Sequence, residues 1–128
     1  MYARAEEAGR RPHVVIAHTD AAYVLGAVRA FRRNGWHFSL AATGPEARRL
    51  ASSFDADLVV LQADLPGESG WLTCAKIHFG DPRCHVILVS DDDEGDEGFA
   101  EFAGAARLVT RAQGAEALLD EVPLAVSA

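Results

Sequence analysis

The sequence of 128 residues has little of several features that mark specialised classes of protein. Its two cysteines are too few for a disulfide-rich secreted framework and favour a reducing, cytoplasmic setting. Its longest apolar runs have the length of a strand, so the sequence predicts no membrane-spanning helix. The first twelve residues carry charges of both signs and no apolar run, which argues against a signal peptide.

Basic residues are also scarce, because 12 Lys and Arg stand against 19 Asp and Glu and give a net charge of −7. Such a chain has few cations with which to neutralise phosphates, so we expect no nucleic-acid binding by this domain. The short apolar runs also lead us to expect no membrane partner. A hydrophobic content of 49% is typical of a folded domain, and the length fits one domain. We expect that domain over residues 13–122, with tails at 1–12 and 123–128.

Short apolar runs alternate with amphipathic segments along the whole chain. This alternation predicts a parallel sheet with helices on both faces, and five strands in this length favour the flavodoxin-like (βα)5 fold with strand order 2-1-3-4-5. The predicted strands are 13–17, 36–42, 58–62, 85–90 and 107–110. The predicted helices are 21–33, 44–54, 69–79, 98–103 and 115–122.

The stretch DLVVLQADLPGESG, residues 57–70, is the centre of this pattern. It contains a strand that is apolar enough to be buried on both faces and that ends at Gln62. The first strand ends just before His18, Thr19 and Asp20. Chemistry in open α/β sheets gathers at the carboxyl ends of the strands, so these side chains are the first candidates for a functional site.

From about His13 to Val122 the chain resembles the receiver domain of two-component response regulators (CheY-like), most specifically in DLVVLQADLPGESG. The resemblance implies a phosphorelay signalling module that is not an enzyme. In that family an acidic pair after the first strand binds Mg²⁺, and an Asp at the end of the third strand accepts a phosphoryl group. A Ser or Thr and a Lys on the next two strands then bind the phosphoryl oxygens.

Several residues at the matching positions differ from the family pattern. The acidic pair falls on His18 and Thr19, and Asp20 is the carboxylate that remains there. The phosphoacceptor position falls on Gln62, whose amide is not a useful nucleophile. Because Mg²⁺ prefers several oxygen ligands, we expect its binding to be weak or absent, and we expect no cofactor.

The resemblance places the remaining site positions on the last two strands. The hydroxyl position falls on Ser90, which keeps the family's residue type, and the lysine position falls on Arg111. The switch aromatic of the family falls on Leu108. Together these departures predict a pseudo-receiver, which acts through protein–protein contacts without phosphorylation.

Three alternatives remain open for this edge of the sheet. Asp20 could ligate a cation, although an Asp before a helix more often caps it. Asp64 could replace the missing phosphoacceptor, although it lies beyond the strand in the turn. A small molecule could occupy the former phosphorylation pocket. We expect Gln62 to fill that pocket and to form hydrogen bonds with Ser90 or with the backbone after His18.

Two other groups of side chains could suggest a metal site. Cys74 and His78 lie four residues apart on one predicted helix, and Cys84 and His85 follow, but their spacing matches no common zinc finger, so core packing is favoured. The acidic loop 91–97 does not fit a calcium-binding loop and is interpreted as solvated. We therefore predict no metal site.

The resemblance also implies a partner surface. Related receivers dimerise or bind effectors through the fourth helix, the fifth strand and the fifth helix, which correspond here to residues 98–103, 107–110 and 115–122. We expect a protein partner or a homodimer at this face.

Overall fold

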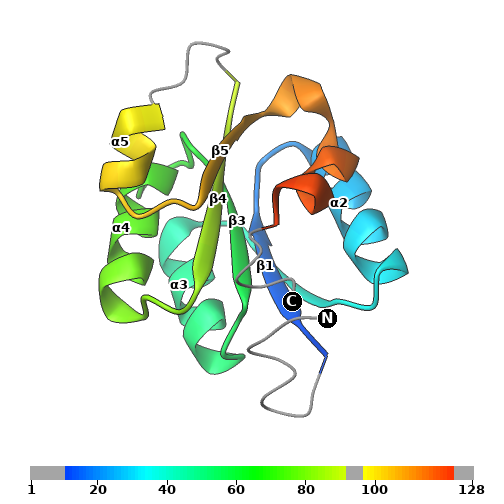
Figure 1. The fold of residues 1–128 in the computed structure, drawn as a ribbon, viewed down its shortest axis with the longest axis horizontal. Coiled ribbons are helices and arrows are strands. Elements are labelled where there is room, and N and C mark those ends of the chain that lie inside the picture. The colour runs from blue at the N-terminus through cyan, green and yellow to red at the C-terminus, as the bar shows by residue number, and fades with distance from the viewer. Residues whose placement is uncertain (1–10, 92–96, 123–128) are drawn as a thin grey trace.

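The computed structural model describes residues 11–91 and 97–122, which form a layered α/β fold (Figure 1). Five parallel strands form one sheet in the order β2-β1-β3-β4-β5, which confirms the predicted flavodoxin-like arrangement. The strands are β1 (His13–Ala17), β2 (His37–Ala41), β3 (Leu58–Gln62), β4 (His85–Ser90) and β5 (Arg107–Thr110).

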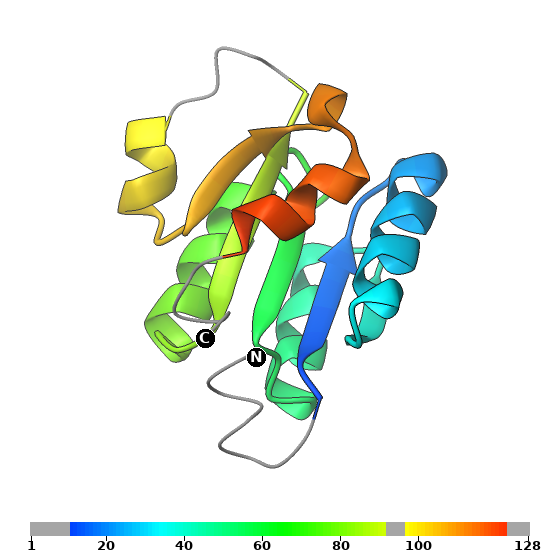
Figure 2. The same cartoon turned by 45° about the vertical axis from the view of Figure 1, so that its right-hand side comes forward.

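Helices cover both faces of the sheet (Figures 1 and 2). One face carries α3 (Gly44–Ser53), α4 (Gly70–Gly80) and α5 (Glu97–Phe102). The other carries α2 (Ala21–Arg33) and the 3₁₀ helix η2 (Ala115–Glu121), which follows the short 3₁₀ helix η1 (Arg111–Gln113). None of the described helices is long and apolar enough to cross a membrane.

The last helix lies where it was predicted and has 3₁₀ geometry. A helix was expected over residues 115–122, and the structure has the 3₁₀ helix η2 there, which Gly114, with a φ of 87°, separates from η1. A 3₁₀ turn of three residues such as η1 is common, whereas a 3₁₀ run of seven residues such as η2 is unusual. The second strand is shorter than expected, because Trp36 lies before β2 and packs its ring edge-on against Phe31 at 5.1 Å. Residues 1–10 of the predicted tail 1–12, the predicted tail 123–128, and residues 92–96 of the acidic loop lie outside the described residues.

Polar caps begin the helices at the carboxyl edge of the sheet. Asp20 caps α2, because its carboxylate accepts hydrogen bonds from the N–H groups of Ala22 at 3.0 Å and Tyr23 at 3.3 Å. This confirms the favoured interpretation of Asp20 as a cap. Thr43 and Ser69 cap α3 and α4 through their hydroxyl groups in the same way.

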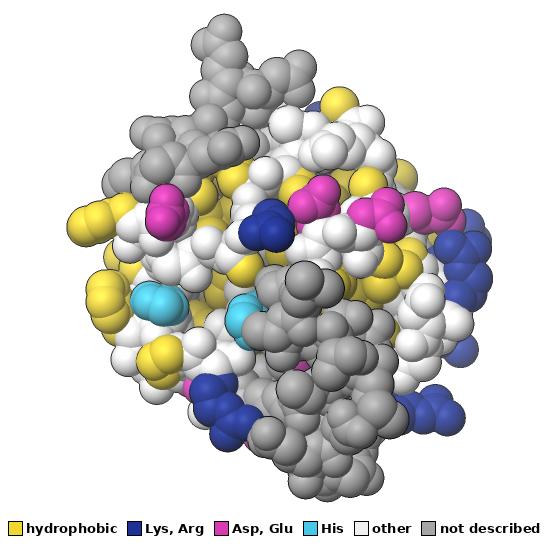
Figure 3. Space-filling view, viewed as in Figure 1, with side chains coloured by type: hydrophobic (Ala, Val, Ile, Leu, Met, Phe, Trp, Pro, Cys, Tyr) yellow, Lys and Arg dark blue, Asp and Glu magenta, His cyan; other side chains and the backbone are white. Residues whose placement is uncertain are grey.

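Charge is unevenly distributed over the surface despite the net charge of −7. The end of α2 is basic, because Arg32 and Arg33 lie in its last turn, where cations interact favourably with the helix dipole. Basic side chains accordingly gather along the right-hand side of Figure 3, the side on which α2 lies in Figure 1.

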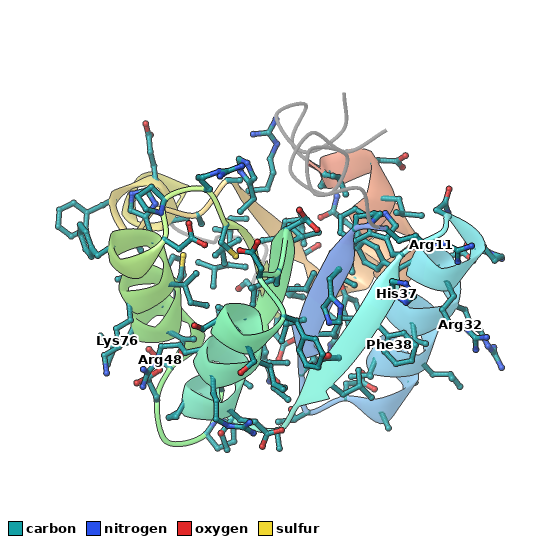
Figure 4. The ribbon with its side chains drawn as sticks, turned by 90° about the horizontal axis from the view of Figure 1, so that it is seen from below. Arg11, Arg32, His37, Phe38, Arg48 and Lys76 are labelled. Carbon is teal, nitrogen blue, oxygen red and sulfur yellow. The ribbon has the colours of Figure 1, made fainter. Side chains whose placement is uncertain are left out.

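The loop from β3 to α4 is held by a charged cluster around Glu68, whose side chain is 9% exposed. Arg48 of α3 donates two hydrogen bonds to this carboxylate at 3.0 and 3.1 Å. Lys76 donates at 2.7 Å and the Thr73 hydroxyl at 2.6 Å, both from α4. Figure 4 shows Arg48 and Lys76 side by side at this part of the molecule. The cluster fixes the loop that follows Gln62 against two helices.

Replacement of Glu68 by Gln is expected to lower the free energy of unfolding by about 2 kcal/mol, because charge-assisted hydrogen bonds lose their anion. Hydrogen bonds from Arg48, from Lys76 and from the Thr73 hydroxyl lower the pKa of Glu68 from 4.5 to about 2. A lowered pKa stabilises the fold above pH 4.5, and this contribution is lost as the pH falls toward about 2. Chemical denaturation across this pH range measures both effects.

The matched control is Glu116→Gln, which removes an exposed ion pair to Arg33 at 2.7 Å. This change is expected to cost less than about 1 kcal/mol, because solvent screens both groups. Equal losses in the two variants would contradict the anchoring role of Glu68.

Candidate functional site

Gln62 ends β3 and is the most buried of the predicted site residues, with 8% of its surface exposed. Its side-chain oxygen accepts hydrogen bonds from the backbone N–H of Thr19 at 2.7 Å and from the Thr19 hydroxyl at 2.8 Å. Its amide nitrogen donates to Asp64 Oδ1 at 3.2 Å. The expected contact with the backbone after His18 is therefore present. Gln62 ties the end of β3 to the end of β1.

The backbone at Gln62 and Ala63 is in close contact with the start of α4. A Cβ at Gly70 would collide with the carbonyl oxygen of Gln62, so glycine is required at the start of α4. The N–H of Gly70 also donates to the carbonyl of Ala63 at 2.9 Å. The turn that carries Asp64 is thus folded back tightly over the strand end.

His18 lies beside this hydrogen-bonded pair and is held in one orientation. Its Nδ1 accepts a hydrogen bond from the N–H of Asp20 at 2.9 Å, which places the proton of the neutral ring on Nε2. Its ring stacks on Tyr23 with centroids 4.7 Å apart. Burial lowers the pKa of His18 below its ordinary value of 6.5, so the ring is neutral at pH 7.

Arg111, at the start of η1, joins two carboxylates across the edge of the sheet. One guanidinium nitrogen lies 3.0 Å from Asp20 Oδ2, and Nε lies 3.0 Å from Asp91 Oδ1. The pKa of Asp20 is lowered, and the main cause is the hydrogen bond from the backbone N–H of Tyr23. Arg111 lowers it further. The single positive charge of Arg111 therefore interacts with the negative charges of both Asp20 and Asp91, and all three side chains are partly exposed.

The structure brings the other predicted positions to the same edge, with one exception. Ser90 ends β4 and pairs in register with Thr110 at the end of β5. Asp64 is exposed in the turn after β3, as predicted. Leu108 is the exception, because it lies within β5 and packs, partly buried, against the core beneath α4 and α5.

Two partners of this site were missed by sequence reasoning. Asp91 was assigned to a solvated loop, although its position directly after Ser90 places it at the strand end, where Arg111 reaches it. Tyr23 was assigned only to the apolar stripe of its helix, but it also stacks on His18. Burial raises the pKa of Tyr23 to about 12. Such contacts between distant segments leave no pattern in the sequence.

Within the ranges 11–91 and 97–122, no three His, Cys, Asp or Glu side chains are placed to hold a metal ion. Cys74 is buried, and its thiol lies 3.4 Å from the carbonyl of Ala103. Burial raises its pKa to about 12, so the thiol is protonated at neutral pH. Cys74 is therefore part of the core packing, as the sequence favoured.

The chain matches the response regulator receiver domain family over residues 14–123. It is also 30% identical over 90 residues to the adventurous-gliding motility protein Z of Myxococcus xanthus. That similarity spans 69% of this chain and 6% of the other protein, so it concerns a small part of a much longer molecule.

Solved structures with the same fold include several receiver domains. The signal receiver domain of an HD domain-containing protein from Pseudomonas fluorescens is 23% identical, with a TM-score of 0.80 over 91% of this chain and 94% of that one. A CheY-like receiver domain protein from Methanospirillum hungatei is 22% identical, with a TM-score of 0.75 over 88% and 90% of the two chains. At these identities the similarity establishes the fold.

Replacement of Gln62 by Met, which is similar in shape and lacks the amide, is expected to lower the free energy of unfolding by about 2 kcal/mol. The reason is that the N–H and hydroxyl of Thr19 lose their acceptor at a part-buried position, on a side chain that is itself buried. Urea denaturation measures the change.

Gln113 provides a matched control, because its side-chain oxygen also accepts from the N–H and hydroxyl of one threonine, Thr110, at 2.9 and 3.4 Å. Gln113 is exposed, so water can replace these bonds and Gln113→Met is expected to cost about 0.5 kcal/mol. If both variants lose the same stability, burial of Gln62 does not determine its contribution.

Proposed function

Because the chain belongs to the response regulator receiver domain family, we propose that it is a two-component signalling module that acts without phosphorylation of its own. In this proposal the domain transmits information through protein–protein contacts, and the site at the carboxyl edge of the sheet has a structural role. The observation that carries the proposal is the side chain of Gln62.

A carboxamide at the end of β3 cannot replace the carboxylate that the family uses. The amide is a poor nucleophile and forms no stable acyl phosphate. Both ends of the Gln62 side chain are also engaged, the oxygen by Thr19 and the nitrogen by Asp64. An incoming phosphoryl group would have to displace hydrogen bonds that hold β1 and β3 together.

The charges around Gln62 support the same proposal. Phosphoryl transfer needs a metal ion and a free cation to offset negative charge on the transferred group. Here the guanidinium of Arg111 is paired with Asp20 and Asp91, and Asp20 is also engaged in capping α2. His18 occupies a position where the family has a carboxylate, and burial keeps it neutral because its pKa is lowered.

The partner surface that we propose consists of α5, β5 and η2. β5 is an edge strand of the sheet, and Phe102 at the end of α5 is 80% exposed. Nε of Arg107 in β5 lies 3.5 Å from Oε2 of Glu121 in η2, and this ion pair links two elements of the surface. We propose that a second copy of the chain binds here.

A second candidate function keeps phosphorylation but moves the acceptor to Asp64. This carboxylate is exposed and receives one hydrogen bond from Gln62 at 3.2 Å, so a phosphoryl donor could reach it. The first experiment below separates the two candidates.

Incubation of the natural protein with acetyl phosphate and Mg²⁺ is expected to add no phosphoryl group, as measured by intact mass. The physical reason is the absence of a carboxylate nucleophile at Gln62. A gain of one phosphoryl group that is lost in Asp64→Asn would instead establish Asp64 as the acceptor. Gln62→Asp serves as the control, and labelling of that variant alone would identify the nucleophile as the missing component.

Sedimentation velocity at increasing protein concentration is expected to reveal dimers that Phe102→Glu abolishes, because a charge would be buried in the interface. Phe79→Glu is the matched control, since Phe79 is 77% exposed on α4, outside the proposed surface. A monomer at all concentrations, or equal effects of both changes, would contradict dimerisation through α5, β5 and η2.

A further inference from the structure

The opposite edge of the sheet, at β2, presents backbone groups that pair with no strand within residues 11–91 and 97–122. β2 pairs with β1, and no strand lies along its other side in the described part of the chain. The N–H of His37 donates to the carbonyl of Pro12 at 2.8 Å, toward β1. Since successive residues of a strand point their backbone groups to opposite sides, those of Phe38 and Leu40 point away from β1.

The side chains at this edge are apolar where an edge strand is usually protected by charge. Phe38 is 36% exposed and Leu40 is 47% exposed. Their register with Val14 and Ile16 places both on the face of the sheet that α2 covers. Natural edge strands commonly carry Lys, Pro or a bulge to prevent pairing with other chains. β2 has none of these devices within its five residues.

Basic side chains of α2 adjoin this edge. Arg32 and Phe38 line a shared hollow of about 350 Å³, and Figure 4 shows them close together on one side of the molecule. Arg32 forms no ion pair with any residue that the structure describes. Leu25, which is 50% exposed, lies seven residues before Arg32 and so shares its side of α2. The combination is a cationic and apolar surface on a chain whose net charge is −7.

We infer that the open edge of β2, together with Arg32 and Leu25 of α2, is a docking surface for an extended, acidic segment of a partner protein. The segment would add a sixth strand beside β2 and form hydrogen bonds with the outward backbone groups of Phe38 and Leu40. Its apolar side chains would pack on Phe38 and Leu40, and its carboxylates would pair with Arg32. The positive charge of Arg32 attracts an acidic partner to this surface. The net negative charge of the chain repels such a partner from the rest of the molecule.

This inference does not depend on the proposed function. The β2 edge lies at the opposite end of the sheet from β5, and none of its residues belongs to the Gln62 site. Failure of the dimer at α5, β5 and η2, or labelling by acetyl phosphate, would leave the β2 surface unaffected.

The test uses the whole chain, labelled with ¹⁵N, and a synthetic peptide in which Glu and Val alternate over about nine residues. Titration is expected to shift the amide resonances of residues 37–41 most strongly. Hydrogen exchange of the Phe38 and Leu40 amides is expected to slow at least about tenfold in the complex, because these N–H groups become paired. Binding is expected to weaken at high salt.

Two matched changes give the inference its controls. Arg32→Glu is expected to weaken binding about fivefold, since attraction becomes repulsion at an exposed site. Arg49→Glu, the same change at an exposed position of α3, is expected to leave binding unchanged. A peptide with Lys in place of Glu is expected not to bind.

Several results would overturn the inference. The titration would contradict it if the peptide did not bind at millimolar concentration or if the resonance shifts were centred on β5. Unchanged hydrogen exchange of the Phe38 and Leu40 amides would also contradict it. So would equally strong binding of the Lys peptide, or equal effects of Arg32→Glu and Arg49→Glu on binding. Circular dichroism of each variant shows whether its fold is intact, and a variant that loses the fold is replaced by Arg32→Ala.

Discussion

The burial of β3 on both faces is the constraint on which the rest of the structure depends. All five of its residues are buried, so every polar group at its end must find a partner inside the protein. The Gln62 side chain meets this requirement through Thr19 and Asp64, and the following loop meets it through the cluster around Glu68. The carboxyl edge of the sheet is therefore held by hydrogen bonds that run between segments distant in sequence.

This arrangement changes what the edge of the sheet can do. A receiver that responds to phosphorylation needs two arrangements of similar free energy, which a phosphoryl group can bias. Here the Gln62 amide is bound to Thr19 and Asp64, the His18 imidazole accepts from the Asp20 N–H through Nδ1, and the Arg111 guanidinium is paired with two carboxylates, all without a ligand. Under the proposed function the site holds one arrangement, and partners act at the edges and the helix surfaces of the sheet.

Prediction from the sequence was accurate where local patterns determine structure. The strands 13–17 and 85–90 and the helix 21–33 have the expected bounds, because apolar periodicity and caps such as Asp20 are properties of neighbouring residues. It located the helix at 115–122 but not its 3₁₀ geometry, which accompanies the close approach of Ala115 to Gly26 of α2. That contact joins residues that are far apart in the chain.

The sequence by itself determined the fold class, the strand order and the identity of the side chains at the carboxyl edge. These follow from hydrophobic periodicity and from the rules for connecting parallel strands. The tertiary structure alone decided which groups at that edge bind one another, that Arg111 pairs with Asp91, and that Phe38 adjoins Arg32. Such pairings depend on distances between side chains from separate elements, and these distances exist only after the sheet and helices have packed.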